Sequence, residues 1–200
     1  MKKLVLASNN AGKLREFSQL LAMRGIEVVP QASLGVPDAE EPHVTFLENA
    51  LAKARHASRL TGLPALADDS GLCVAALNDE PGVYSARYSA MNGGEKSDQA
   101  NNALLVERLQ GKENRAGRYI ALLVLVRSEN DPQPLVGEGV WPGLIVDAPR
   151  GENGFGYDPH FFLPELGRTA AELSAAQKNA ISHRGKALAE LLRKLDALNG

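Results

Sequence analysis

The sequence of 200 residues has one cysteine, few aromatic residues and no excess of charge of one sign. Cys73 cannot form a disulfide within the chain, which fits a reducing compartment. Lys and Arg number 22 and Asp and Glu number 24, so the strongly basic face that binds duplex nucleic acid is not expected. Aromatic residues make up 5%, which disfavours an RNA-binding module that stacks bases.

The sequence also lacks long apolar runs. Leu4 to Ala7 is too short for the core of a secretory signal, although Lys2 and Lys3 precede it. The longest later run, Ile120 to Val126, is far shorter than a membrane span. We therefore expect a cytoplasmic chain without membrane contact. Its 44% of hydrophobic residues can build one sizeable core, and we expect a single, two-lobed domain over residues 1–200.

Several common functional patterns are absent. His43, His56 and His160 do not have the spacing of zinc ligands, and no cysteine cluster accompanies them. No Gly-x-Ser-x-Gly or Gly-x-Gly-x-x-Gly segment occurs, which weakens a hydrolase triad and a dinucleotide site. A P-loop is excluded because Ala7 and Leu14 stand where it needs Gly and Ser or Thr.

Hydrophobic periodicity and capping residues predict strands that alternate with helices. The predicted strands span residues 4–7, 27–30, 63–67, 72–77, 118–127 and 135–141, and the last two are expected to form a hairpin across Asp131 and Pro132. The predicted helices span residues 13–24, 45–61 and 98–110, and a long C-terminal helix begins at Ser174. Residues 31–44 form a long acidic loop, and loops of this length are often functional.

Two adjacent carboxylates, Asp68 and Asp69, follow the apolar run of residues 63–67. A carboxylate at the edge of a core is costly unless a cation or hydrogen bonds compensate it, so the pair suggests a bound metal. Neighbouring strand residues face opposite sides, and both carboxylates can serve one site only if the strand ends there. Ser70 and Gly71 are expected to end it. The alternative is an ordinary Asp-Asp-Ser-Gly turn.

The segment Ser8 to Lys13 joins a predicted strand to a predicted helix, so its backbone N–H groups can converge on an anion. This arrangement predicts a phosphate cradle, and the alternative is a capped helix with a solvated lysine. Glu41, in the acidic loop, could join the Asp pair around Mg²⁺, which prefers oxygen ligands. Simple surface charge is the alternative for Glu41.

Two later segments could contact a ligand. Phe155 lies between glycines and could offer a flat face to a nucleobase, unless it is a core aromatic under a loop. Lys178 and Ser182 are four residues apart in the predicted C-terminal helix and so share a face, next to His183 and Arg184. Two cations and an imidazole there could stabilise a phosphate, although an ordinary solvated helix face is the alternative.

The order and spacing of these motifs resemble those of the inosine triphosphate pyrophosphatase family over essentially the whole chain, and above all its bacterial house-cleaning members. The motifs are Ser8 to Lys13, Ala67 to Leu72, Gly154 to Pro159 and Ser182 to Gly185. The resemblance implies an α/β fold of three layers, α-β-α, with a long mixed central sheet, a substrate cleft between two lobes, and a homodimer. It also implies Mg²⁺-dependent hydrolysis of dITP, ITP and XTP to the monophosphate and pyrophosphate.

The resemblance further implies roles for individual residues. The triphosphate would be held by Ser8, Asn9, Asn10, Ala11, Gly12 and Lys13. Asp69 would be the catalytic base, and the metal would lie among Glu41, Asp68 and Asp69. The remaining substrate contacts would come from Ser70, Phe155, Gly156, Tyr157, Asp158, Lys178, His183 and Arg184, with Phe155 stacking on the base and His183 and Arg184 near its 6-oxo group.

The chemistry of water attack agrees with these roles. Negative charge that develops on the phosphate oxygens could be neutralised by Mg²⁺ and Lys13, and a nearby carboxylate can take the proton of the water. One residue cannot be both a tight metal ligand and a free base, so Asp69 is expected to activate water while Asp68 and Glu41 carry the metal. The alternatives are a pyrophosphatase for pyrimidine or modified nucleotides, and a catalytically silent nucleotide sensor.

Overall fold

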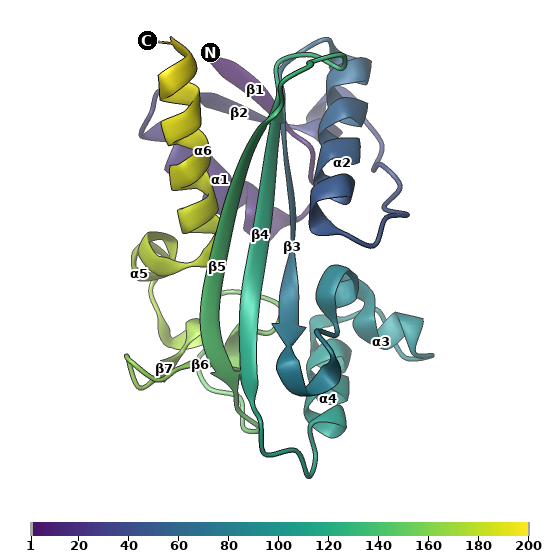
Figure 1. Ribbon diagram of the computed structural model, residues 1–200, viewed down its shortest axis with the longest axis vertical. Helices are drawn as coiled ribbons and strands as arrows, with labels where there is room; N and C mark the ends of the chain where they lie inside the picture. The colour runs from purple at the N-terminus through teal and green to yellow at the C-terminus, as the bar shows by residue number, and fades with distance from the viewer. Residues whose placement is uncertain (1, 200) are drawn as a thin grey trace. The chain divides into compact units, whose positions relative to one another are not determined.

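The computed structural model describes residues 2–199, which form a seven-stranded sheet with helices packed on it (Figure 1). The strand order is β2-β1-β3-β4-β5-β6-β7. β1 pairs in parallel with β2 and β3, whereas β6 pairs antiparallel with β5 and β7. The sheet is therefore mixed, as the predicted α/β fold class requires.

The strands are β1 (Lys3–Leu6), β2 (Glu27–Pro30), β3 (Ala65–Val74), β4 (Ala116–Val126), β5 (Leu135–Ile145), β6 (Phe161–Leu163) and β7 (Arg168–Thr169). The α-helices are α1 (Ala11–Ala22), α2 (Phe46–Thr61), α3 (Tyr88–Met91), α4 (Asp98–Arg108), α5 (Ala175–Ile181) and α6 (His183–Asn199). Short 3-10 helices are η1 (Gln31–Leu34), η2 (Ala75–Leu77), η3 (Gly82–Arg87), η4 (Asp158–His160) and η5 (Ala170–Glu172).

The chain divides into two compact units. Unit 1 contains residues 2–69, 121–139 and 184–199, and unit 2 contains residues 70–120 and 140–183. β3, β4 and β5 each contribute residues to both units. The expectation of a single, two-lobed domain stays a prediction.

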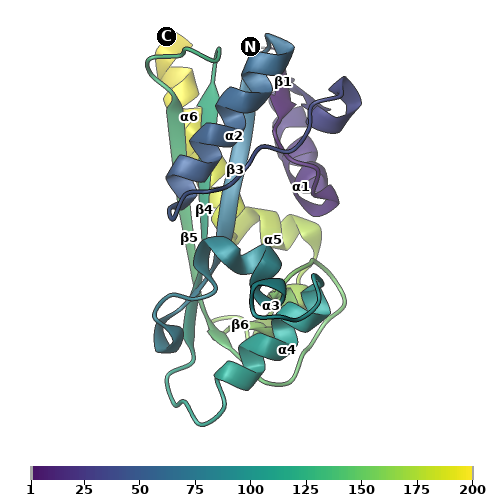
Figure 2. The same ribbon diagram turned by 90° about the vertical axis from the view of Figure 1, so that its right-hand side faces the viewer.

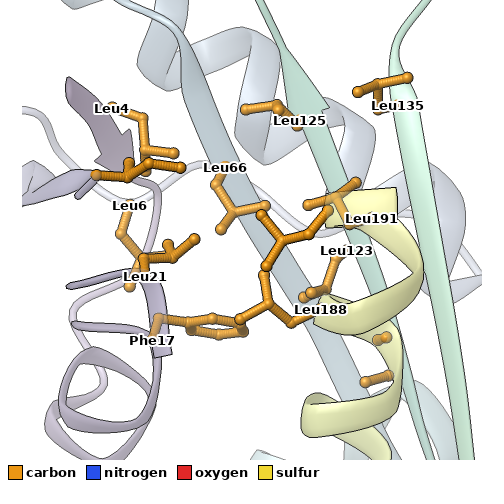
Figure 3. Close-up of a cluster of buried hydrophobic side chains, with 14 residues drawn as sticks. Leu4, Leu6, Phe17, Leu21, Leu66, Leu123, Leu125, Leu135, Leu188 and Leu191 are labelled. Carbon is orange, nitrogen blue, oxygen red and sulfur yellow. The ribbon is translucent and has the colours of Figure 1, made fainter. Parts of the chain in front are cut away.

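Unit 1 has helices on both faces of its strands. Side chains alternate between the faces of a strand, and in unit 1 both faces carry apolar residues. Leu4, Leu6 and Leu66 lie in one apolar cluster with Phe17 of α1 and Leu188 of α6 (Figure 3). The neighbouring residues of these strands face the other side and belong to a second cluster. This cluster contains Val5 of β1, Ala65 and Ala67 of β3, and Ala50, Ala54 and Ala57 of α2. Figure 2 accordingly shows α2 in front of these strands and α6 behind them. Unit 1 thus has the three predicted layers.

In unit 1, helix α2 begins and ends where capping residues predict, whereas α1 is displaced by two residues. Thr45 accepts a hydrogen bond from the N–H of Glu48 at the start of α2, and Gly62 ends this helix in the left-handed conformation. Asn10 caps α1 by accepting from the N–H of Lys13. α1 therefore starts at Ala11, two residues before the predicted start, and ends at Ala22.

Unit 2 has its own apolar core. Leu105 and Leu109 of α4 pack with aromatic residues of β4, β5 and β6, among them Tyr119, Trp141 and Phe161. Tyr119 lies 4.6 Å from Phe161 between ring centroids, and Trp141 lies 5.3 Å from Phe161. Most of the few aromatic residues of the chain that lie in unit 2 therefore serve packing.

Three elements end at residues other than those predicted. β3 runs without a break from Ala65 to Val74, so Asp68 and Asp69 lie inside a strand and not at its end, and Ser70 and Gly71 form no turn. The predicted C-terminal helix is two helices, because the backbone of Ser182 is extended between α5 and α6. Lys178 and Ser182 therefore do not share a helical face. β5 extends to Ile145, four residues beyond the predicted end.

Candidate functional site

Asp68 and Asp69 of β3 are buried, with 1% and 5% of their surface exposed, and they have different partners. Asp68 Oδ2 lies 2.9 Å from Lys13 Nζ and 3.1 Å from Arg184 Nε. Asp69 Oδ1 accepts from Lys53 Nζ at 2.8 Å. Consecutive residues of a continuous strand face opposite sides, which explains the separate partners. Both carboxylates are compensated by cations of the protein, as burial demands.

The two carboxyl groups differ in their affinity for protons. Burial opposes ionisation of Asp68, but the charges of Lys13 and Arg184 outweigh burial and hold the pKa of this carboxyl well below its usual range. For Asp69, burial prevails over the charge of Lys53, and the pKa is raised. Asp69 therefore binds a proton more readily than Asp68. The largest cause of the raised pKa of Asp69 is burial.

Lys53 of α2 is a central member of the site that the sequence reasoning missed. Its Nζ lies 2.7 Å from Glu41 Oε1 as well as 2.8 Å from Asp69 Oδ1. Asn49, one turn earlier in α2, donates to Asp69 Oδ2 at 3.4 Å. The signal was present in the sequence, because Asn49 and Lys53 are polar residues four apart on a helix whose buried face is otherwise mostly alanine.

The predicted metal ligands are Glu41, Asp68 and Asp69. Within residues 2–199, no group of three or more His, Cys, Asp or Glu side chains is arranged to hold a metal ion. Glu41 and Asp69 nevertheless converge on one positive charge, the ammonium of Lys53. Carboxylate oxygens are the donors that Mg²⁺ prefers, so the residues present fit this ion chemically. Asp68 is held apart from them by Lys13 and Arg184.

The predicted phosphate cradle lies at the start of α1. Ala11 and Gly12 are the first residues of this 12-residue helix, so their N–H groups are at its positive end. The side chains of the preceding loop hold the loop in place: Ser8 Oγ accepts from the N–H of Asn10 at 3.2 Å, and Asn9 donates to Asp38 at 2.8 Å. Lys13 reaches from the same turn to Asp68.

Arg184 lies in unit 1, where it is buried and paired with two carboxylates. Its Nε donates to Asp68, and its Nη1 donates to Glu16 of α1 at 3.0 Å. Glu16 was not predicted as a site residue. His183, the first residue of α6, belongs to unit 2, where its ring stacks on Tyr119 at 4.6 Å between centroids and 7° between planes. The structure therefore gives these neighbouring residues different surroundings.

Unit 2 brings together the predicted residues of the Gly154 to Asp158 segment and Lys178. Asp158 Oδ2 accepts from Lys178 Nζ at 2.6 Å and from the N–H of Phe155 at 2.9 Å. Lys178 Nζ also lies 4.9 Å from the centroid of the half-buried Phe155 ring. Gly154, at φ +77°, has no room for a side chain, since a Cβ would meet Asp158 Oδ2 at 2.1 Å. The segment is thus ordered by a buried ion pair.

Tyr157 and Ser70 complete the predicted site residues. The Tyr157 ring is buried in the core of unit 2, and its hydroxyl donates to the carbonyl of Ser85 at 2.7 Å. Burial raises the pKa of the Tyr157 phenol well above its usual range. Tyr157 is therefore an anchor of the segment. Ser70 is half-buried in β3, directly after Asp69.

The chain is an α/β protein in which buried charged residues cluster, as is common at functional sites. The chain belongs to the Ham1 family, whose family model matches residues 4–194. A protein of Bordetella pertussis named dITP/XTP pyrophosphatase is 68% identical over 197 residues, which are 98% of this chain and 92% of that protein. A protein of the same name from Ralstonia nicotianae is 64% identical over 195 residues, 98% of this chain and 97% of that one.

A solved structure of a HAM1 protein from Coxiella burnetii is similar throughout. It has a TM-score of 0.89 and 49% sequence identity, and the match covers 98% of this chain and 100% of that one. The predicted family and fold class are therefore confirmed. In the described part of the chain, no helix is long and apolar enough to cross a membrane.

Proposed function

We propose that this chain hydrolyses dITP, ITP and XTP to the nucleoside monophosphate and pyrophosphate, and so removes deaminated purines from the nucleotide pool. It is an enzyme of the nucleoside triphosphate pyrophosphatase class, the class after which its relatives are named. The observation that carries the proposal is Asp69: a buried carboxylate with a raised pKa, oriented by Lys53 and Asn49. Such a group is a stronger base than an ordinary carboxylate and can take a proton from water.

The triphosphate is bound by the residues at the start of α1. The N–H groups of Ala11 and Gly12 attract phosphate oxygens, and the side chains of Ser8, Asn9 and Asn10 shape the loop around them. Lys13 adds a full positive charge. Burial lowers the pKa of the Lys13 ammonium, and the negative charge of Asp68 opposes this change. A phosphate that approaches Lys13 would support its charged form in the same way.

Hydrolysis begins when Asp69 takes a proton from a water molecule. The oxygen of this water forms a bond to the α phosphorus while the bond from that phosphorus to the bridging oxygen breaks. Pyrophosphate then leaves, and the nucleoside monophosphate remains. Lys53 fixes the orientation of the Asp69 carboxylate, and Lys13 stabilises charge that develops on the phosphate oxygens.

Mg²⁺ is proposed as the cofactor. Glu41 and Asp68 would hold it, so that Asp69 remains available as the base, and when bound it supplies positive charge that neutralises the phosphate oxygens. The oxygen chemistry of the donor set and the convergence of Glu41 with Asp69 on one cation support the role of Glu41. Asp68 is paired with Lys13 and Arg184, so it would have to exchange one of these cations for the metal.

Binding of the purine base of the substrate is assigned to residues of unit 2 and to Arg184. Phe155 stacks on the purine, held by its N–H bond to Asp158. His183 and Arg184 are assigned to the 6-oxo group, and Ser70 to the phosphates beside Asp69. A site built for a 6-oxo acceptor rejects ATP, because the 6-amino group leaves buried donors unpaired. GTP carries the same 6-oxo group, so its exclusion acts on the 2-amino group.

We also propose that the chain works as a homodimer in the cytoplasm, without a nucleic-acid partner. The buried, single Cys73 supports a reducing compartment. The near balance of charge supports the absence of a nucleic-acid partner.

The test is a measurement of pyrophosphate released from dITP, ITP, XTP, GTP, ATP and dTTP, with Mg²⁺ and with excess chelator. We expect release from the first three nucleotides, with Mg²⁺ only. A preference for dTTP would replace this function by a pyrimidine pyrophosphatase. Tight binding of dITP without pyrophosphate release would replace it by a nucleotide sensor.

A further inference from the structure

The peptide groups of Gly156 are held from both sides by one helix. The N–H of Gly156 donates to Asp98 Oδ2 at 2.7 Å, and its carbonyl accepts from Asn102 Nδ2 at 2.9 Å. Asp98 and Asn102 are four residues apart in α4 and therefore lie on the same face of the helix. All three residues belong to unit 2.

The position of Asp98 shows that its carboxylate is not needed as a helix cap. Ser97 caps α4, because its side chain accepts from the N–H of Ala100. An acidic residue in the first turn favours the helix dipole, but a dipole effect needs no specific partner. The Asp98 carboxylate instead makes a short, charge-assisted hydrogen bond to a residue 58 positions away.

The side chain of Asn102 bonds to Gly156 and not to its own helix. In the part of the chain that the structure describes, its Oδ1 is buried and has no hydrogen-bond partner. A buried amide oxygen without a partner is a cost to stability. The amide is therefore held in an orientation that favours the Gly156 carbonyl, and its removal is not expected to unfold α4.

The segment around Gly156 needs such support. Gly154 and Gly156 both have positive φ, at +77° and +62°. Glycine can adopt many other backbone conformations, so a glycine-rich loop needs contacts that select this one. Beside the α4 contacts, Asp158 holds the N–H of Phe155, and Tyr157 is anchored to Ser85. Each residue from 155 to 157 is thus fixed by a different part of unit 2.

We propose that Asp98 and Asn102 are positioning residues for nucleobase binding: they hold the Gly156 peptide so that the ring of Phe155 is presented to the base in one orientation. This inference rests on the proposed function, in which Phe155 stacks on the purine. Among the described residues, these two bind the Gly156 peptide and none of the residues assigned to the phosphates, so they would act through Phe155. Their effect is therefore confined to the binding of substrates that carry a base.

The first test needs no substrate. Hydrogen exchange is measured by mass spectrometry for Asp98→Ala, Asn102→Ala and the matched control Gln99→Ala, which changes an exposed residue in the same turn. We expect faster exchange in the peptide around residues 154–158 for the first two variants and no change for the control. Unchanged exchange in both variants would overturn the proposal, whether or not the chain is an enzyme.

The second test separates positioning from catalysis. Asp98→Ala and Asn102→Ala are expected to raise KM for dITP about tenfold and to leave kcat within about twofold, because base binding is weakened and the chemical step is not. Asp98→Asn keeps an oxygen acceptor and should restore most of the affinity, whereas Asn102→Asp loses the donor and should not. Gln99→Ala should resemble the unchanged chain.

Inorganic triphosphate serves as the probe without a base. Its inhibition constant is expected to stay the same in all variants. An equal loss of triphosphate and dITP binding would contradict the inference, since the effect would then reach the phosphate residues. An unchanged KM for dITP would do so as well. If the unchanged chain releases no pyrophosphate from any nucleotide, the proposed function fails, and a tenfold rise in the calorimetric Kd for dITP becomes the required result.

Discussion

The ammonium of Lys53 lies 2.8 Å from the carboxylate of Asp69, and α2 and β3 thereby place a fixed positive charge beside a carboxylate that burial makes more basic. This pair has two consequences. It holds Asp69 in one orientation, and it makes the stability of unit 1 depend on both partners, because a buried charge without its partner is costly.

Asp69→Asn is expected to lower pyrophosphate release from dITP by about 100-fold or more, since an amide cannot take the proton of water. The measurement is kcat with Mg²⁺ present. Asp147→Asn is the control, because Asp147 is an exposed carboxylate paired with Arg115 at the surface of unit 2. Near-normal turnover of Asp69→Asn would remove Asp69 as the base.

Lys53→Met is expected to lower the free energy of unfolding by about 3 kcal/mol, because it removes the cation that pairs with the buried carboxylate of Asp69 and with the half-buried Glu41. Urea unfolding gives the value. Lys3→Met removes an exposed ion pair with Glu27 and should cost less than about 1 kcal/mol. Equal effects of the two substitutions would mean that the Lys53 pair contributes no more than a surface pair.

The lowered pKa of Asp131 leads us to expect that the stability of the fold depends on pH. Hydrogen bonds from Arg127 hold the pKa of the Asp131 carboxyl well below its usual range, and hydrogen bonds from the backbone N–H groups of Arg127 and Gln133 act in the same direction. A carboxyl whose pKa is lower in the folded chain than in the unfolded chain stabilises the fold above the unfolded value, about 4, and this contribution is lost as pH falls towards the folded value.

Asp131→Asn should therefore destabilise the chain at neutral pH, and the difference should shrink as the pH falls below about 4. Urea midpoints at several pH values test this. Glu129→Gln is the control in the same turn, since Glu129 lies 3.8 Å from Arg59 with both side chains exposed. A difference that stays constant down to low pH would refute the lowered pKa.

Gly154→Ala is expected to disrupt the Phe155 segment. The new Cβ would lie 2.1 Å from Asp158 Oδ2, in addition to the strain of a positive φ. Gly25→Ala is matched for φ, at +67°, but nothing lies within 4 Å of its Cβ. We expect Gly154→Ala to raise KM for dITP more than tenfold, by loss of the Asp158 contact to Phe155, and Gly25→Ala to leave KM unchanged while costing about 1 kcal/mol of stability. Equal KM values for the two variants would contradict this role of Asp158.

Local signals predicted the elements whose ends are capped. Thr45 and Gly62 bracket α2 as expected, because both act through hydrogen bonds and backbone conformation within one turn. The motifs also led to the family. The same local reasoning failed at Asp68 to Gly71, where residues typical of turns lie in a continuous strand. There the compensating cations come from α1, α2 and α6, which no window around residues 68–71 contains.

The prediction of a single C-terminal helix was wrong for a similar reason. The sequence predicted one long helix from Ser174, whereas the structure has two, α5 and α6. The break at Ser182 separates Lys178, which is bound to Asp158, from Arg184, which is bound to Asp68 and Glu16. Helical periodicity does not reveal these three ion pairs, one made in unit 2 and two in unit 1.

The sequence by itself determined the family, the order of strands and helices, and most residues of the candidate site, since these depend on residue type and spacing. The tertiary structure alone decided which charges meet: Asp68 with Lys13 and Arg184, Asp69 with Lys53, and Gly156 with α4. The physical reason is that the cost of burying a charge or a peptide group is met by whichever partner the packing brings near, at any distance along the chain.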